Sequence, residues 1–515
     1  MRAPITRLAP RLGAPLAIAA GAALLRILSG VGFANYDTLY ALAWGGQLSR
    51  GATPSYGVPI APTPHPLVEA LGLLLSPLGP HAVEQITVAL GFLALSACGW
   101  VLYRLGAAWF GRAAGALGAL ILLTRVPILS YGVRAYVDLP YLLLVLSALL
   151  VESRRRAIEN RPAGAPVLAL LALAGLLRPE AWAFSGLYWL YLMDWIPPFL
   201  RARPRTPEGP PPVGVGSAVG EWSRRTRSEL AGLTLLALAA PLVWVLSDLA
   251  ITGDPLWSLT NTRHTATTLH RVTGIANVPE YIPRRIGEIL RPPVLVGAAL
   301  GGILSLLWLR RRALAGAAAG VLSVVVFAAF AAAGLPINSR YAFLAAAILC
   351  LFCGAGVFGW TGLDREDPRR RWWMAGGALV VIALLAYAPS QYRAAHRELD
   401  KLARQQSIQD DLLALVDGRS ITLRCGPVGV PNHAPVALLA LYLKTSPANI
   451  RSASEGTAGG QVKPISSGDY VDPASKEVEE DYVLDPRDPH LPANVPPGFT
   501  EVHANRSWLI FQRCA

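Results

Sequence analysis

Charged and aromatic residues of this chain gather in short turns between long apolar runs, and their types suit proton transfer and anion binding. A carboxylate beside a reacting hydroxyl can act as its general base. Arginine side chains can stabilise negative charge that develops on a leaving group. The candidates from four such turns are Asp37, His65, Arg134, Asp138, Arg178, Glu180, Arg340 and Tyr341.

The two acids Asp37 and Asp138 each stand where an apolar run meets a polar turn. An acid at the edge of a bilayer, beside helix ends that exclude water, indicates a functional site. Hard ions take oxygen ligands, so the two carboxylates could together hold a divalent cation such as Mg²⁺ or Mn²⁺. Both acids could instead be structural, because Asp is a favoured N-cap: Asp37 for a helix over 38–48, and Asp138 for the next apolar helix.

The other candidates also allow structural explanations. Arg178 and Glu180 could simply pair across a proline break, and His65 could be no more than a residue of a Pro-rich turn. Arg340 could extend along the helix surface to lipid headgroups. What favours a binding site is that separate turns on one side of the membrane supply all of these groups.

Composition places the chain in the membrane. Of its 515 residues, 53% are hydrophobic and only 15% are charged, against roughly 25% in soluble domains, and its mean hydropathy is +0.41. The formal charge of +13 arises from arginines concentrated in alternate loops. This pattern indicates membrane topology and not nucleic-acid binding.

Apolar runs of sufficient length predict about 11 transmembrane helices. The arginine bias then puts the N-terminus in the cytoplasm, and the first loop and the C-terminal tail outside it. We expect a transmembrane module over residues 1–389, interrupted by a Pro-rich cytoplasmic linker at 199–228 and a long outer loop at 251–292. The expected spans are 12–33, 82–103, 110–131, 138–152, 165–178, 181–197, 229–250, 293–309, 313–333, 341–359 and 372–389.

Residues 390–515 are predicted to form a small extracytoplasmic α/β domain. We expect a polar helix over 391–416, a strand over 421–425, a helix over 434–443, a loop over 452–480 and a final strand at 507–514. Cys425 and Cys514 each end a predicted strand outside the cytosol, where disulfides persist. We therefore predict a disulfide between them.

The motifs resemble those of the GT-C glycosyltransferases. The resemblance rests on Asp37 after the first span, the Pro64-His65-Pro66-Leu67 stretch, Asp138 at the start of a later span and Arg340-Tyr341 before another. Members of this superfamily, which include protein O-mannosyltransferases and aminoarabinose transferases, use polyprenyl-phosphate sugars. The resemblance implies transfer of a sugar, with inversion and with Asp37 as general base, to an extracytoplasmic glycan, lipid or protein.

This sequence departs from the superfamily pattern at two places. Relatives often carry Lys-Pro-Pro-Leu where this chain has His65, and many have paired acids where it has Asp37 alone. Two other functions stay open: a catalytically silent relative that binds or scaffolds envelope glycans, and a secondary transporter. Transporters place charges near the bilayer midplane and often have repeated halves, whereas these charges lie at one surface and no repeat is visible.

Overall fold

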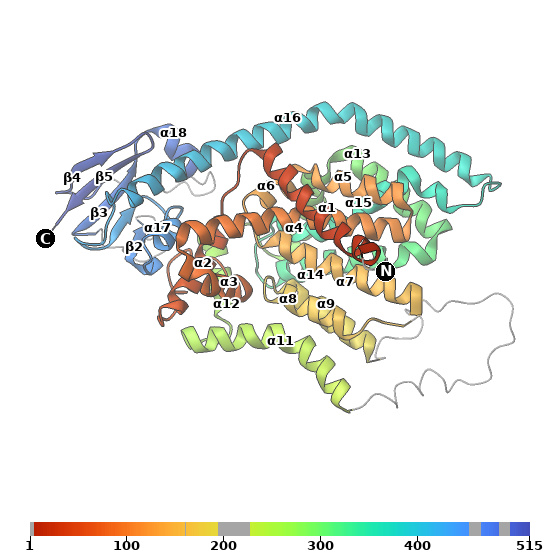
Figure 1. Ribbon diagram of the computed structural model, residues 1–515, viewed down its shortest axis with the longest axis horizontal. Coiled ribbons are helices and arrows are strands. Elements are labelled where there is room, and N and C mark those ends of the chain that lie inside the picture. The colour runs from red at the N-terminus through yellow and green to blue at the C-terminus, as the bar shows by residue number, and fades with distance from the viewer. Residues whose placement is uncertain (1–4, 160, 194–226, 453–464, 484–494, 515) are drawn as a thin grey trace.

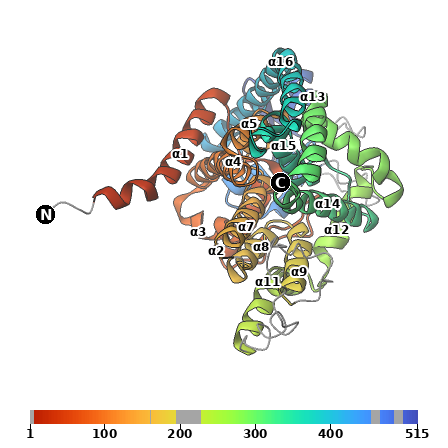
Figure 2. The same ribbon diagram turned by 90° about the vertical axis from the view of Figure 1, so that its right-hand side faces the viewer.

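The computed structural model describes residues 5–159, 161–193, 227–452, 465–483 and 495–514. Helices form a bundle, and a small mixed sheet lies at one end of it (Figure 1). The predicted linker at 199–228 lies almost wholly outside the described residues. A second view shows α1 projecting from one side of the bundle and α11 at its margin (Figure 2).

The helices of the first half follow the apolar runs of the sequence. Short polar turns separate them, and two short helices, α2 and α3, lie between α1 and α4. Their bounds are α1 Ile5–Ser29, α2 Tyr36–Ser49, α3 Pro66–Leu75, α4 Pro80–Trp109, α5 Arg112–Leu123, α6 Val126–Val133, α7 Asp138–Glu159, α8 Ala165–Gly175 and α9 Glu180–Leu192.

The second half begins with α11, which coincides with the predicted span at 229–250, and ends in the tail. Helix α13 contains a break at Arg291, where φ is 66°, so its second part alone coincides with the predicted span at 293–309. The bounds are α11 Arg227–Thr252, α12 Trp257–Thr268, α13 Val278–Trp308, α14 Arg310–Ala332, α15 Phe343–Phe358, α16 Arg369–Asp417, α17 Val436–Tyr442 and α18 Lys476–Val478.

Within the described residues each predicted span overlaps a helix, although 194–197 of the span at 181–197 lie outside them, and the predicted helical class is confirmed. Within the described residues, six helices are long and apolar enough to cross a membrane, or seven if the bent pair α5 and α6 forms one span. These two helices meet at 65°. Length and composition thus support a membrane protein, and the count of 11 stays a prediction.

Close packing at two glycines positions two pairs of helices. Gly45 of α2 lies so near the backbone of Glu69 on α3 that an added Cβ would overlap it. The same is true of Gly301 on α13, which lies against the carbonyl of Phe352 on α15. Only glycine permits such approaches, which hold α2 on α3 and α13 on α15.

Helix α16 replaces two helices that the sequence predicted as separate. Two separate helices were predicted at 372–389 and 391–416, but one 49-residue helix runs from Arg369 to Asp417 with Pro389 inside it. It extends along the bundle and reaches the sheet (Figure 1). One proline removes a single backbone hydrogen bond, and good helix formers on both sides preserve the helix.

The tail contains a five-stranded sheet in the order β2-β1-β3-β5-β4. Strand β1 pairs in parallel with β2 and β3, and β5 pairs antiparallel with β3 and β4. The strands are β1 Val428–Val430, β2 Ile450–Ser452, β3 Gly468–Pro473, β4 Thr500–Ala504 and β5 Trp508–Arg513.

Two predictions in the tail are wrong. Residues 421–425 form no strand, because the backbone N–H of Thr422 donates to the buried carboxylate of Asp469 at 2.6 Å and not to a neighbouring strand. The predicted loop at 452–480 contains β3 and α18, although its residues 453–464 lie outside the described part.

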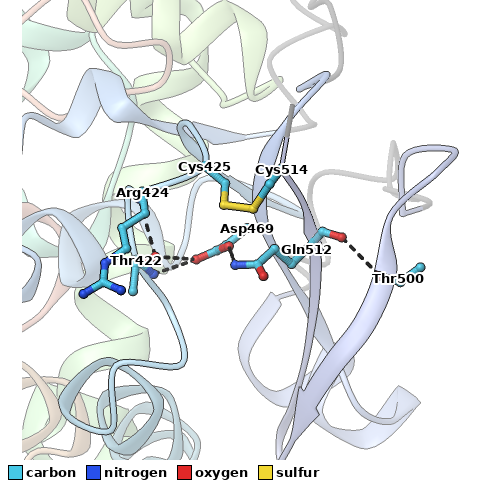
Figure 3. Close-up of a disulfide and its surroundings, with 7 residues drawn as sticks. All are labelled: Thr422, Arg424, Cys425, Asp469, Thr500, Gln512 and Cys514. Carbon is cyan, nitrogen blue, oxygen red and sulfur yellow. Dashed lines mark hydrogen bonds between the residues drawn. A yellow bond between two sulfur atoms is a disulfide. The ribbon is translucent and has the colours of Figure 1, made fainter.

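A disulfide joins Cys425 to Cys514, with a Cα–Cα distance of 4.8 Å (Figure 3). Beside it, Asp469 also accepts a hydrogen bond from Gln512 of β5 at 2.8 Å. The bridge and this carboxylate therefore tie the segment before β1 to the last strand of the chain.

Candidate functional site

The N-cap of α2 is Asn35 and not Asp37. The Asn35 side-chain oxygen accepts hydrogen bonds from the backbone N–H groups of Asp37 and Thr38, at 2.8 and 3.3 Å. The alternative role of Asp37 as an N-cap is therefore wrong. Its carboxylate is available for contacts with other elements.

The turn between α6 and α7 holds the start of α2 in place. The backbone N–H of Phe33 donates to Val133 at 3.2 Å, and that of Asn35 donates to Arg134 at 2.9 Å. The Thr38 hydroxyl donates to the Ala135 carbonyl at 2.9 Å. Backbone bonds of this kind fix Asp37 relative to the bundle.

Asp37 pairs with Arg340, 303 residues later in the chain. The Arg340 Nη1 donates to Asp37 Oδ2 at 2.6 Å, and both side chains are largely buried. Burial favours the neutral acid, but the Arg340 guanidinium outweighs it and holds the pKa of Asp37 below its ordinary value. Asp37 is therefore ionised at neutral pH.

Arg178 is the centre of a second buried charge cluster. It forms an ion pair with Asp138, and Glu180 accepts its Nη2 and Nε hydrogens at 2.5 and 2.9 Å. The ring of Tyr341 lies 4.6 Å from the guanidinium carbon. All three charged side chains are at most 6% exposed, so this is more than a pair of residues at a proline break.

His65 is buried near both clusters. Its ring forms an edge contact with Trp244 at a centroid distance of 6.4 Å, and its Nδ1 has no hydrogen-bond partner among the described residues. Burial lowers the pKa of His65 to about 4, with Arg340 and Arg178 adding to the effect and Asp37 opposing it. The ring is therefore neutral at physiological pH and cannot serve as a cation there.

These groups face a cavity of about 310 Å³, which we name the Asp37 cavity. Its lining combines charged or polar side chains with large apolar ones, as an amphiphilic ligand would require. The charged or polar side chains include Asp37, His65, Arg178, Glu180, Asp248 and Arg340. The apolar side chains include Trp182, Trp244, Leu256, Leu259, Phe330 and Leu335.

The sequence candidates thus converge, with two exceptions. Asp138 does not line the cavity, but it forms an ion pair with Arg178, which does. Arg134 also lies outside the lining, where it contacts the rings of Tyr131 and Tyr136 and donates to Ser130 Oγ at 2.8 Å.

The carboxylates do not fit the expected divalent-cation site. Asp37 is paired with Arg340 and Asp138 with Arg178, so a metal ion shared by the two acids would lie beside two guanidinium cations. Within the described ranges, no group of three or more His, Cys, Asp or Glu side chains is arranged to hold a metal ion.

Sequence reasoning missed Asp248. Its carboxylate lines the cavity and accepts two hydrogen bonds from Ser258, from the backbone N–H at 2.8 Å and from the hydroxyl at 2.9 Å. An acid inside the predicted span at 229–250 was the available signal, because charges within apolar spans usually have a partner or a function.

Comparison with solved structures identifies the fold. The chain superposes on the crystal structure of ArnT from Cupriavidus metallidurans bound to undecaprenyl phosphate, with a TM-score of 0.53 over 97% of this chain and 98% of that one. The chain has a GT-C fold. Sequence identity is 15%, so the similarity establishes the architecture alone. The predicted resemblance to the GT-C glycosyltransferases is confirmed at this level.

A more distant similarity is to the apo oligosaccharyltransferase of Archaeoglobus fulgidus, at 12% identity and a TM-score of 0.47, over 91% of this chain and 69% of that one. No protein-family model and no curated protein matches the chain.

Proposed function

We propose that this protein is a membrane glycosyltransferase that moves a sugar from a polyprenyl-phosphate donor to an extracytoplasmic glycan, lipid or protein. The observation that carries the proposal is the Asp37–Arg340 pair in the lining of a cavity that also has large apolar side chains. A lipid-linked phosphate sugar combines an anionic head with an apolar chain in the same way.

Asp37 is the general base in this proposal. Arg340 donates to Oδ2, which leaves Oδ1 for the hydroxyl of the acceptor. The acceptor oxygen bonds to the anomeric carbon as the bond from that carbon to the phosphate oxygen breaks. The hydroxyl proton passes to Asp37, and the electron pair leaves with the polyprenyl phosphate. A single displacement of this kind inverts the anomeric carbon.

Arg340 and Arg178 stabilise the leaving phosphate. The Nε of Arg340 is buried without a hydrogen-bond partner among the described residues, so this N–H remains to donate to an anion. A phosphate that shares Arg340 with Asp37 weakens the hold on the carboxylate. Its basicity therefore rises when the donor binds, which is when a base is needed.

The remaining candidates orient these groups. Asp138 and Glu180 fix the Arg178 guanidinium, and Tyr341 packs on its face. His65 supplies a neutral polar wall. The apolar rings of Trp182, Trp244 and Phe330 would contact the first isoprenoid units. The cavity faces the extracytoplasmic side, the N-terminus is cytoplasmic, and residues 390–515 form an extracytoplasmic domain in this proposal.

The test is turnover of a polyprenyl-phosphate sugar by the purified protein. Asp37→Asn keeps the side-chain shape and removes the base, so turnover should fall about 100-fold or more. Asp364→Asn, at an exposed loop position, should retain wild-type turnover and serves as the matched control. Near wild-type turnover in Asp37→Asn, with the fold intact, would exclude Asp37 as the base.

The same assay separates the alternatives. A scaffold or glycan-binding protein would show no turnover in the wild type, and its cellular phenotype would survive Asp37→Asn. Addition of EDTA should leave turnover unchanged, because both acids already bind arginines.

A further inference from the structure

A second cavity, of about 540 Å³, lies apart from the Asp37 cavity, and no step of the proposed reaction uses it. We name it the Glu84 cavity. It lies between the start of α4, the tail part of α16 and the end of α17, beside the backbone of Gly32 and Phe33. Its size is within the range of small-molecule sites.

The wall from α16 is one face of that helix. Gln406, Gln409, Asp410, Leu413 and Asp417 line the cavity, and the last four stand 3, 4, 7 and 11 residues after Gln406. Helical residues at this spacing share a face. The sequence of α16 therefore presents amides and carboxylates to the same space.

Fixed hydrogen bonds hold the opposite wall. Glu84 is 8% exposed and accepts from the backbone N–H of Ala34 at 3.0 Å and from the hydroxyl of Tyr442 at 2.6 Å. Gln406 Oε1 accepts from the backbone N–H of Gly32 at 2.9 Å. A wall positioned in this way loses little conformational entropy when a ligand binds.

The charges select against an anion. Carboxylates line the cavity at Glu84, Asp410 and Asp417, against the guanidinium of Arg26 and a histidine, His81, that contacts Asp417 at 3.1 Å. The Asp37 cavity also has three carboxylates in its lining, but two arginines, Arg178 and Arg340, oppose them there, whereas Arg26 is the one arginine that lines the Glu84 cavity. A phosphate or an acidic sugar would meet repulsion in the Glu84 cavity.

The polar groups suit hydroxyls. A hydroxyl is both donor and acceptor, carboxylates accept, and amides do both. Gln85, Gln406 and Gln409 supply amides, and the side chains of Gln85 and Asp410 form no hydrogen bond to other described residues. Such a set satisfies several hydroxyls of one ligand.

We propose that the Glu84 cavity binds a saccharide whose rings are uncharged or carry ammonium groups. It is a docking site for a glycan outside the reaction centre, and Phe33 in its wall is four residues from Asp37. The proposal goes beyond the glycosyl transfer reaction and does not depend on it.

The experiment measures binding to the full-length protein in phosphatidylcholine nanodiscs by isothermal titration calorimetry, without a donor. Three β-1,4- or α-1,4-linked tetrasaccharides serve as probes: glucosamine tetramer, N-acetylglucosamine tetramer and galacturonic acid tetramer. We expect the amino tetramer or the neutral one to bind, and the acidic one not to bind. Asp410→Asn should weaken the amino tetramer about 10-fold, the loss of one charge-assisted hydrogen bond.

One control variant and one further variant of the site complete the test. Asp400→Asn, an exposed acid of the same helix outside the cavity, should bind as the wild type does. Gln85→Ala, at an exposed position of α4, should weaken the neutral tetramer while the protein stays folded. The proposal is overturned if neither tetramer binds, if the acidic one binds best, or if phosphatidylethanolamine in the nanodisc abolishes binding by occupying the site. Turnover is not measured, so these outcomes leave the proposed reaction standing.

Discussion

Removal of Arg178 should destabilise the protein far more than removal of an exposed arginine. In Arg178→Met, the carboxylates of Asp138 and Glu180 lose their shared counter-charge although their side chains are only 1% and 5% exposed. Breaking a buried ion pair from one side costs about 3–5 kcal/mol, because the remaining charge stays desolvated. The contact with the Tyr341 ring is also lost. We therefore expect a loss near the upper end of that range.

The measurement is the free energy of unfolding in detergent, from a denaturant titration. Asp138→Asn on the Arg178→Met background should recover part of the loss, because it removes one of the two unpaired charges. The control is Arg155→Met: Arg155 pairs with Glu159 at 2.7 Å, but the side chains are 52% and 42% exposed. That variant should lose about 0–1 kcal/mol. Equal losses in Arg178→Met and Arg155→Met would refute the buried-cluster account.

Three further predictions concern the tail and the pH dependence. Tyr442→Phe removes the hydrogen bond from the tyrosine hydroxyl to Glu84, and Glu84 also accepts from the backbone N–H of Ala34, just before α2. We expect steady-state kinetics to show kcat lowered about 3–10-fold with the donor KM unchanged, because Asp37 is then positioned less well. An unchanged kcat would contradict this positioning role. Asp37 must be ionised to accept a proton, and the Arg340 guanidinium lowers the pKa of Asp37. We therefore expect kcat/KM not to fall as the pH is lowered from 8 to 5. A fall in kcat/KM centred near pH 6 would mean that another group is the base. Non-reducing peptide mapping should find Cys425 joined to Cys514. Cys514→Ser should lower the free energy of unfolding by roughly 4–5 kcal/mol, the chain-entropy value for this 89-residue separation. Free thiols at both positions would contradict the bridge.

Composition and charge were sufficient to predict the helical class and the group of polar turns that meet. Apolar runs must form helices in a membrane, and charges in the turns between them are costly unless they pair or bind. Asp37 and Arg340 are 303 residues apart in the chain, yet both were candidates because each stands at an apolar boundary. Their pairing with each other, and that of Arg178 with Asp138, depends on helix packing that no local pattern encodes.

Local chemistry was misleading where tertiary contacts compete with it. Asn35 is the N-cap of α2, and its backbone N–H is held by the carbonyl of Arg134 in the neighbouring turn. The general preference of Asp for the N-cap position predicted Asp37 instead, because it takes no account of that tertiary contact. Thr422 and its neighbour Ile421 are β-branched, which favours a strand, but the backbone N–H of Thr422 donates to the side chain of Asp469 and not to another strand. The contact between Glu84 and Tyr442 joins residues 358 positions apart, and only the fold brings them together.

The most direct test of the central claim is a density map of the full-length protein with polyprenyl phosphate bound. The account predicts the phosphate in the Asp37 cavity, within hydrogen-bond distance of Arg340, with the first isoprenoid units against Trp182 and Trp244. Arg340→Ala should abolish that density while the fold persists. A phosphate bound elsewhere, with the Asp37 cavity empty, would contradict the assignment of this cavity as the donor site.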